Sequence, residues 1–344
     1  MRRSRCAAVC LGACTALLAG CSPGGKSNAR SGNTIRIGVT VYDKHDTFIS
    51  ELMDAFAEDI SRLSTETGKS ITVETVDAAT SQSAQNEQVS NLISKGCNVV
   101  CVNLVDRTEP TTITDMAEKN DVPIIFFNRE LVAEDLERWD RLYYVGADAV
   151  QSGVLEGQIV ADKSKESPEI DRNGDGVLQY ITLEGEAGHQ DAIIRTEYSI
   201  STIMDAGIKV EKLGYARANW NRAQGQTQMA ALLEKFGERI EVIIGNNDDM
   251  ALGAVDALQA AGIDQKEWPL IVGIDGTKTG LAAVKKHQLE GTVYNDKEGQ
   301  AKYMADLAFA LSTDGDLSDL PLTDGRYLRT PYQTVTKENI SDFQ

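Results

Sequence analysis

The chain has 344 residues, of which 42% are hydrophobic and 25% charged; this suits two domains of about 150 residues each and excludes a wholly disordered protein. Its 52 acidic residues outnumber the 34 basic ones, and the formal net charge is −18. Because a nucleic-acid backbone would be repelled by this excess of carboxylates, we expect no nucleic-acid partner.

The first 33 residues are typical of an export signal followed by a tether. Residues 1–20 combine a basic start with an uncharged, small and apolar run that is shorter than the ~20 residues of a membrane span. The run ends in Leu18-Ala19-Gly20-Cys21, which resembles a bacterial lipobox. This interpretation predicts cleavage before Cys21, acylation of its thiol by a palmitate-type chain, and a flexible tether over residues 21–33. A plain signal peptide is the alternative.

From Thr34 onward, short β-rich apolar segments alternate with longer amphipathic ones. We predict strands at 35–42, 71–76, 99–102, 122–127, 141–145, 178–183, 208–213, 242–244, 270–274 and 291–293. We predict helices at 49–62, 83–94, 112–119, 149–161, 192–205, 223–236, 250–260, 281–286 and 301–311, and a polar loop at 163–176. The alternation predicts an α/β fold whose parallel sheets are covered on both faces, and its length predicts two such sheets.

Cys97 and Cys101 lie four residues apart in one apolar segment. Four strand residues span roughly 13 Å, which is too far for a disulfide. We therefore expect both to be small buried residues and expect no disulfide framework.

Polar and aromatic side chains gather where the predicted strands end, and open α/β sheets bind ligands at the carboxyl ends of their strands. Short polar residues there can instead cap the next helix, and this interpretation covers Asp248 and Asp296. It does not explain Phe48 and Trp220, which are large aromatics beside loops, one in each half. As a pair, they suggest stacking on a ligand with flat apolar faces.

In their order and spacing, these segments resemble the galactose/glucose-binding periplasmic proteins, a family in the ribose-binding branch of solute-binding proteins, over residues 35–343. The motifs are Asp46 with Phe48, Asn103-Leu-Val-Asp106, Val-Pro-Ile-Ile-Phe-Phe-Asn128, Gly188-His-Gln-Asp-Ala192 with Arg195, residues 240–248, Gly273-Ile-Asp275 and residues 291–296. Gln190 departs from the pattern, since a proline is common there.

The resemblance implies two similar doubly wound parallel-sheet domains joined by a three-segment hinge, the type I periplasmic binding protein fold. The N-terminal domain would comprise 34–145 and 297–331, and the C-terminal domain 146–296 and 332–344. The resemblance further implies that Phe48 and Trp220 sandwich a pyranose, and that polar groups bind its hydroxyls: Asp46, Asn103, His189, Asp191, Arg195, Asn247, Asp275 and Asn295. Asp46 would reach the 4-hydroxyl and admit both D-glucose and D-galactose.

The segment from Asp171 to Gln179 has the spacing of the front of a calcium-binding loop, with Gly176 at the sharp turn. Its oxygen ligands would be the side chains of Asp171, Asn173, Asp175 and Gln179 and the carbonyl of Val177. Position 12 of the loop is Thr182 instead of glutamate. The resemblance supplies Glu241 as the missing carboxylate, and we expect one structural calcium ion; a solvated turn is the alternative.

The resulting hypothesis is an extracytoplasmic, lipid-anchored monomer that binds D-glucose and D-galactose and delivers them to the permease of an ABC transporter. We expect no enzymatic activity. A glycosidase could use the imidazole and carboxylate of His189 and Asp191, or the paired carboxylates of Asp46 and Asp275, and is therefore the main alternative. A DNA-binding repressor would begin with a basic helix-turn-helix, whereas residues 1–20 have the pattern of an export signal, so we do not expect a repressor. Sugar sensing for a chemoreceptor and binding of another monosaccharide stay open.

Overall fold

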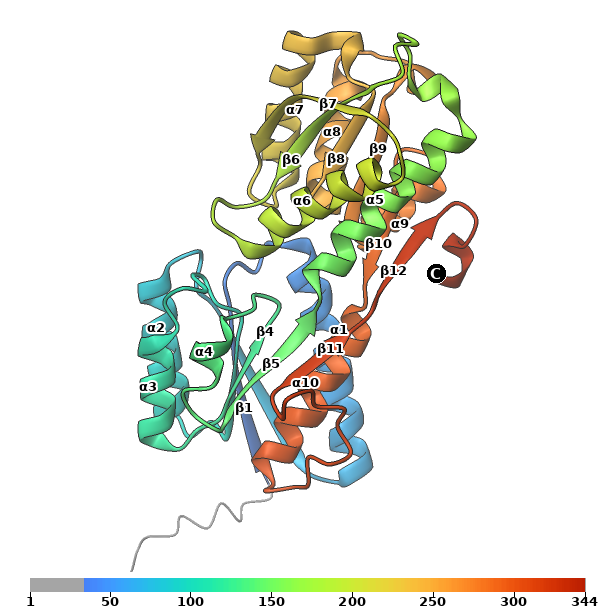
Figure 1. Cartoon of the computed structure of the whole chain (residues 1–344). Helices are drawn as coiled ribbons and strands as arrows, with labels where there is room; N and C mark the ends of the chain where they lie inside the picture. Colours follow the sequence, from blue (N-terminus) through green and yellow to red (C-terminus); the bar gives the residue numbers. More distant parts are fainter. Residues whose placement is uncertain (1–33, 344) are drawn as a thin grey trace, which may run out of the picture. The chain divides into compact units, whose positions relative to one another are not determined.

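The computed structural model describes residues 34–343, which form two six-stranded sheets (Figure 1). The first sheet has the order β11-β5-β4-β3-β1-β2 and is parallel throughout; its strands are β1 (Thr34–Val41), β2 (Ser70–Asp77), β3 (Val99–Val102), β4 (Ile124–Phe127), β5 (Leu142–Ala147) and β11 (Tyr327–Thr330).

The second sheet has the order β12-β10-β9-β8-β6-β7 and is parallel except for β12, which runs antiparallel to β10. Its strands are β6 (Leu178–Glu184), β7 (Val210–Arg217), β8 (Val242–Gly245), β9 (Leu270–Asp275), β10 (Gly291–Asn295) and β12 (Tyr332–Thr336). We call each sheet with its helices a lobe.

Helices cover both faces of each sheet. On the first sheet, α1 (Thr47–Thr67) and α10 (Lys297–Ser312) pack on one face, and α2 (Gln82–Ser94), α3 (Thr111–Asn120) and the short α4 (Ala133–Leu136) pack on the other. On the second sheet, one face carries α5 (Ala149–Glu166) and α6 (Gln190–Asp205); the other carries α7 (Arg222–Phe236), α8 (Asp248–Ala260) and α9 (Lys278–Lys285). The predicted α/β class with two doubly wound sheets is confirmed.

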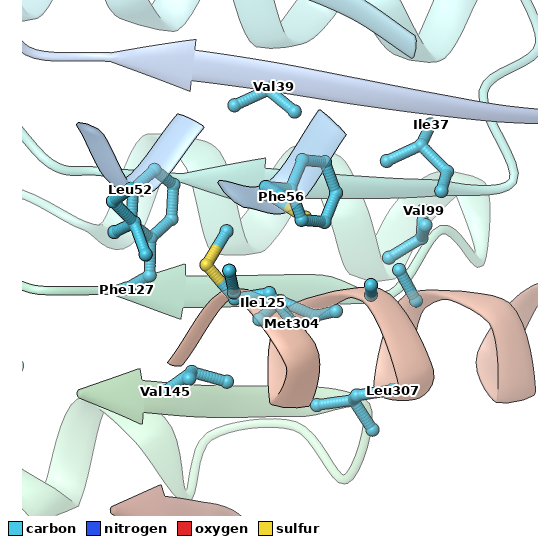
Figure 2. Packing of buried hydrophobic residues seen from close by; sticks show 14 of the residues in the cluster. Ile37, Val39, Leu52, Phe56, Val99, Ile125, Phe127, Val145, Met304 and Leu307 are labelled. Carbon is cyan, nitrogen blue, oxygen red and sulfur yellow. The ribbon is translucent and has the colours of Figure 1, made fainter. Parts of the chain in front are cut away.

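The core of the first lobe shows how the sequence pattern produces these layers. Figure 2 shows Ile37 and Val39 of β1 on the same side as Phe56 of α1 and Met304 of α10, and all four are buried. Alternate strand residues point to opposite faces. Every residue of β3 and of β4 is buried, which explains their continuous apolar runs.

Cys97 and Cys101 lie on opposite faces of the sheet although they are four residues apart, because Cys97 precedes β3 and is outside its alternation. Cys101 lies in the core under α1 and α10, whereas Cys97 lies in the core on the other face of the sheet. Both are buried free thiols, as expected.

The chain passes between the sheets three times: from β5 into α5, from β10 into α10, and from β11 into β12 (Figure 1). Residues 34–343 nevertheless belong to one compact unit. The domain boundaries expected from the sequence therefore stay a prediction.

The structure departs from the expected elements mainly at their ends. Helix α5 runs on to Glu166 and a 3-10 turn follows at Pro168–Ile170, so the loop expected from 163 is shorter than predicted. Strands β11 and β12 were not expected. They have four and five residues, and their apolar side chains are too few to show a period.

The predicted signal segment, Cys21 and the tether all lie outside the described residues. Within residues 34–343, no helix combines the length and apolar character needed to cross a membrane.

Candidate functional site

A cavity with an empty volume of about 340 Å³, counting its open mouth, lies between the ends of strands from both sheets. First-lobe side chains in its lining are Tyr42, Asp46, Phe48, Asn128 and Arg129; second-lobe side chains are His189, Asp191, Arg195, Trp220, Asn247 and Asp275. The structure thus brings together eight of the ten side chains predicted to bind sugar.

The two predicted stacking residues enter the cavity from opposite lobes. Phe48 lies in the first turn of α1 and Trp220 in the turn between β7 and α7, and both are buried. The ring of His189 meets that of Trp220 edge to face, with 4.9 Å between centroids. This geometry suits aromatic pairs and holds the indole at the cavity wall.

Asp46 has a structural bond on each carboxylate oxygen. Its Oδ1 accepts the amide hydrogen of Ile49 (2.9 Å) and so caps α1, while its Oδ2 accepts from the hydroxyl of Tyr42 (2.6 Å). Burial raises the pKa of Asp46, and the Tyr42 hydroxyl acts in the opposite direction. Two contacts leave about two of the four lone-pair sites of a carboxylate open to a ligand.

Two further lining residues cap helices of the second lobe. Asn247 Oδ1 accepts the amide of Met250 at 3.0 Å, at the start of α8. His189 Nδ1 accepts the amide of Asp191 at 3.1 Å, at the start of α6. Burial, with Arg129 and Arg195 nearby, holds the pKa of His189 well below its usual value. The imidazole is therefore neutral, and its hydrogen is on Nε2, the nitrogen free to donate to a ligand.

Arg195 is the central cation of the site. It is buried, and its Nη1 and Nη2 donate to the carbonyl of Asn246 (2.8 Å) and to the hydroxyl of Tyr332 (3.1 Å). Oxygens of Asp191 and Asp275 both lie 3.7 Å from its guanidinium nitrogens. The guanidinium thereby offsets part of the cost of burying the two acidic side chains.

Two buried donors at the cavity have no hydrogen-bond partner among the described residues: Arg195 Nε and Trp220 Nε1. A buried polar group without a partner costs about 1–3 kcal/mol. Both donors would be satisfied by a ligand that carries oxygen acceptors.

Three lining residues have left-handed backbone conformations: Asn128 (φ 63°), Trp220 (φ 63°) and Asp275 (φ 121°). Asparagine and aspartate tolerate this region, whereas a tryptophan there is strained by roughly 1–3 kcal/mol. Such strain concentrates at functional sites, and here it aims the indole of Trp220 into the cavity.

Burial shifts the remaining lining carboxyls in one direction. It raises the pKa of Asp191, against the effect of Arg195, and raises that of Asp275 well above its usual value. Desolvated carboxylates next to unpaired donors suit a neutral ligand with hydroxyl groups, because each hydroxyl both donates and accepts.

Two predicted side chains are not in the cavity lining. Asn103 is buried behind it, where its side chain bonds the amide of Tyr42 (3.3 Å) and Oδ1 of Asn128 (3.1 Å). Asn295 is buried and accepts from Gln300 Nε2 at 2.6 Å. In this structure Asn103 supports two lining residues, and Asn295 anchors the start of α10.

Tyr42, Asn128 and Arg129 line the cavity but were not predicted to do so. All three directly follow strands, Tyr42 after β1 and the other two after β4. The rule that ligands bind at strand carboxyl ends would have found them had it been applied to every strand.

The capping interpretation holds for one of its two residues. Asp296 caps α10 through the amide of Gly299 at 2.9 Å. For Asp248 it is wrong, because this buried carboxylate accepts from Thr292 Oγ1 at 2.6 Å and from the amide of Thr277 at 2.8 Å. Asp248 joins α8 to the loops after β9 and to β10, a contact that sequence spacing does not reveal.

The predicted calcium loop forms a compact turn before β6. Asp171 accepts the amides of Gly174 and Gly176, each at 2.8 Å, and Gln179 bonds both Asn173 (3.0 Å) and Asp175 (3.1 Å). Glu241 is buried and accepts the amides of Arg172 (2.7 Å) and Gln179 (2.9 Å). Within residues 34–343, no group of three or more His, Cys, Asp or Glu side chains is placed to hold a metal. The calcium ion therefore stays a prediction.

Comparisons with known proteins agree with this architecture. Residues 37–316 match a family model described as a periplasmic binding protein domain. The D-galactose/methyl-galactoside-binding periplasmic protein of Haemophilus influenzae is 36% identical over 93% of this chain and 95% of its own length. A putative rhizopine-binding protein of Rhizobium meliloti is 30% identical over 92% and 94%, respectively.

Among solved structures, an ABC transporter solute-binding protein from Bacillus halodurans with bound myo-inositol has a TM-score of 0.74 and 29% identity, covering 90% of this chain and 96% of its own. These relatives are binding proteins, which confirms the interpretation of the chain as a binding protein rather than an enzyme. The family description also agrees with the expected extracytoplasmic location. The chain belongs to the periplasmic binding protein family.

Proposed function

We propose that the chain binds D-glucose and D-galactose between its lobes and delivers them to the permease of an ABC transporter. One observation carries the proposal: Phe48 and Trp220 line one cavity from opposite lobes, with polar groups around them. A pyranose has two faces of C–H groups and a rim of hydroxyls. Aromatic rings suit the faces, because the negative π surface attracts the positive C–H edge.

The polar lining matches the hydroxyl rim. Asp46, Asp191 and Asp275 supply acceptors, while His189 Nε2 and the unpartnered Arg195 Nε and Trp220 Nε1 supply donors. Hydrogen bonds to ionised groups are the strong kind. A ligand that lacks one hydroxyl would leave a buried group unpaired, and this gives the site its selectivity.

Two relatives suggest which ligands to test. The Haemophilus influenzae relative is named for D-galactose and methyl-galactoside, which favours a hexopyranose. The Bacillus halodurans structure holds myo-inositol, a cyclic polyol without a ring oxygen. This structure makes a cyclitol the second candidate ligand, and a titration must distinguish a cyclitol from a hexopyranose.

Calorimetric titration of the purified protein tests the proposal. The panel is D-galactose, D-glucose, D-ribose, xylitol and myo-inositol. We expect both hexoses to bind and ribose to bind at least tenfold more weakly, since it presents a smaller apolar face and fewer hydroxyls. Binding of myo-inositol alone would replace the hexose proposal with a cyclitol, and equal binding of ribose would remove the proposed selectivity.

Delivery to a permease follows from closure around the ligand. A sugar that contacts both lobes stabilises the arrangement in which they meet, and a permease can recognise that arrangement. Sensing for a chemoreceptor would use the same binding step with another partner. Uptake of labelled galactose by cells that lack this gene distinguishes the two functions. If the protein serves transport, its deletion abolishes uptake; if it serves only as a sensor, uptake is unchanged.

We further propose that Cys21 carries a lipid anchor that holds the protein on the extracytoplasmic side of a membrane. The lipobox-like sequence before it supports this proposal. A Cys21→Ser variant should appear in the soluble fraction and still bind sugar. Continued partition into membranes would contradict the anchor.

Finally, we propose that the loop from Asp171 to Gln179, together with Glu241, holds one calcium ion. The donors are carboxylate, amide and carbonyl oxygens, which are the ligands calcium prefers. Glu241 reaches the loop from a distant part of the sequence and already bonds two of its amides. The chemistry of the residues therefore fits the ion, and bound calcium would tie the loop to the segment before β8.

A further inference from the structure

Arg129 lies where the wall of the cavity meets the other lobe. It follows β4 in the first lobe, is buried, and belongs to the cavity lining. Its guanidinium carbon is 3.7 Å from the centroid of the Tyr42 ring, and its Nη1 donates to the carbonyl of Val105 at 2.8 Å. Stacking and hydrogen bonding together fix the plane of the guanidinium.

The same guanidinium makes a two-point contact with Glu186, which follows β6 in the second lobe. Nη2 lies 3.1 Å from Oε1, and Nη1 lies 3.0 Å from Oε2. Other polar contacts between the lobes lie outside the cavity lining: Thr47 Oγ1 donates to Asp249 at 2.6 Å, and the amide of Lys278 donates to Glu51 at 3.0 Å. The Arg129–Glu186 pair thus joins the lobes through a residue that also faces the ligand.

We propose that Arg129 couples recognition of the sugar at Asp46 to contact between the lobes; the inference rests on the proposed function. The contacts form an unbroken series, in which Asp46 accepts from the Tyr42 hydroxyl, the Tyr42 ring stacks under Arg129, and Arg129 pairs with Glu186. A sugar hydroxyl bound to Asp46 reinforces the carboxylate and Tyr42 in this arrangement, and the stacked ring holds Arg129 against Glu186.

Arginine is suited to this place, because a planar guanidinium can stack and form a forked pair simultaneously. A lysine can pair with Glu186 but cannot also stack in the same way. The pair exists only when the lobes are together, so it stabilises that arrangement alone. Its loss should therefore raise the dissociation rate of the sugar and leave the association rate little changed.

The test is a double-mutant cycle on the full-length protein with Glu186→Gln, Arg129→Gln and the double variant, together with Arg129→Lys. Stopped-flow and calorimetric titrations use the five compounds of the panel. A donor and an acceptor dye, one on an exposed position of each lobe, report the distance between lobes with and without ligand. Glu290→Gln is the matched control: its carboxylate is 33% exposed, against 31% for Glu186, and pairs with Lys163 inside one lobe.

We expect Glu186→Gln to weaken hexose binding by roughly 3- to 30-fold, mainly through faster dissociation. Arg129→Lys should recover part of the affinity lost in Arg129→Gln. In the double variant, the fold-loss in hexose affinity should be smaller than the product of the two single losses. Glu290→Gln should bind as the wild type does.

The coupling would be overturned if Glu186→Gln bound hexose with wild-type affinity. It would also be overturned if the fold-loss in affinity of the double variant equalled the product of the two single losses. Either result would leave the sugar proposal standing. If the wild type binds no compound of the panel, the proposed function fails. The dye distances then test only whether the pair joins the lobes: a longer distance in Glu186→Gln than in the wild type supports this contact, and identical distances overturn it.

Discussion

The hydroxyl of Tyr42 donates to Oδ2 of Asp46 across 2.6 Å, and this bond joins the end of β1 to the first turn of α1. Asp46 thereby combines two tasks, since its other oxygen caps the helix. Burial raises the pKa of both groups, so Tyr42 keeps its proton and acts as the donor. The residue proposed to admit both hexose epimers is therefore held rigidly.

The first prediction concerns this carboxylate. Asp46→Asn should weaken the binding of at least one hexose by about 1–3 kcal/mol, the size of a hydrogen bond to a charged group. The loss should differ between D-glucose and D-galactose, because an amide keeps one acceptor and turns the other into a donor. Parallel calorimetric titrations measure it. Unchanged affinity for both hexoses would leave Asp46 as a helix cap only.

The second prediction concerns stacking. Trp220→Ala should weaken hexose binding by about 1–3 kcal/mol through lost apolar contact and ring stacking. Trp220 also packs in the core beneath α7 and α8, so the melting temperature should fall as well. Binding is therefore measured well below that temperature, with circular dichroism as a check on folding. Wild-type affinity in a folded Trp220→Ala variant would contradict the aromatic sandwich.

The third prediction concerns Glu156, a buried residue of α5 that takes no part in the site. Burial raises its pKa to about 8. Its Oε2 lies 2.5 Å from Ser199 Oγ, which is also 2.7 Å from the carbonyl oxygen of Arg195. A hydroxyl has one hydrogen, so a proton on Glu156 is needed for both contacts to be hydrogen bonds.

A raised pKa means that the folded chain binds this proton more tightly than the unfolded chain. The contribution of Glu156 to stability is complete below its ordinary value of 4.5 and is lost as the pH rises through about 8. Glu156→Gln imitates the protonated acid and should raise the free energy of unfolding at pH 8 by roughly 1–3 kcal/mol, with little effect near pH 4.5. Urea unfolding at both pH values measures it, and Glu166→Gln at the exposed end of α5 is the control. Equal gains at both pH values would contradict the protonated state.

The fourth prediction concerns calcium. An ion that binds only the folded chain stabilises it by mass action, so a chelator should lower the melting temperature. Glu241→Gln should reduce that difference, whereas sugar affinity should change little because the loop lies away from the cavity lining. Differential scanning calorimetry with calcium and with chelator provides the measurement. Equal melting under both conditions would identify the loop as a solvated turn.

The sequence was sufficient for the fold and for most of the cavity. Buried strands and amphipathic helices have distinct periods, which predict the fold. The resemblance to galactose/glucose-binding proteins then assigned His189, Asp191 and Asp275, which lie near strand ends, to the site. The strand-end rule could have placed Arg129 at the cavity, but its contacts with the ring of Tyr42 and with Glu186 in the other lobe are not revealed by any spacing along the chain.

Other details depend on which way a side chain turns. Asn103 follows β3 as predicted, yet its amide bonds Tyr42 and Asn128 behind the cavity. The same logic explains Asp248, which lies at a strand end like a cap but turns inward to threonines of the loop after β9 and of β10. Strand order predicts the edge of a sheet, and packing then decides which side chains reach the cavity.

A crystal structure with D-galactose tests the central claim most directly. We predict a pyranose whose faces lie against Phe48 and Trp220, with sugar oxygens within hydrogen-bond distance of Arg195 Nε and Trp220 Nε1, the two donors without a partner in the described chain. A sugar bound elsewhere, or one in the cavity that leaves both donors unpaired, would contradict the account.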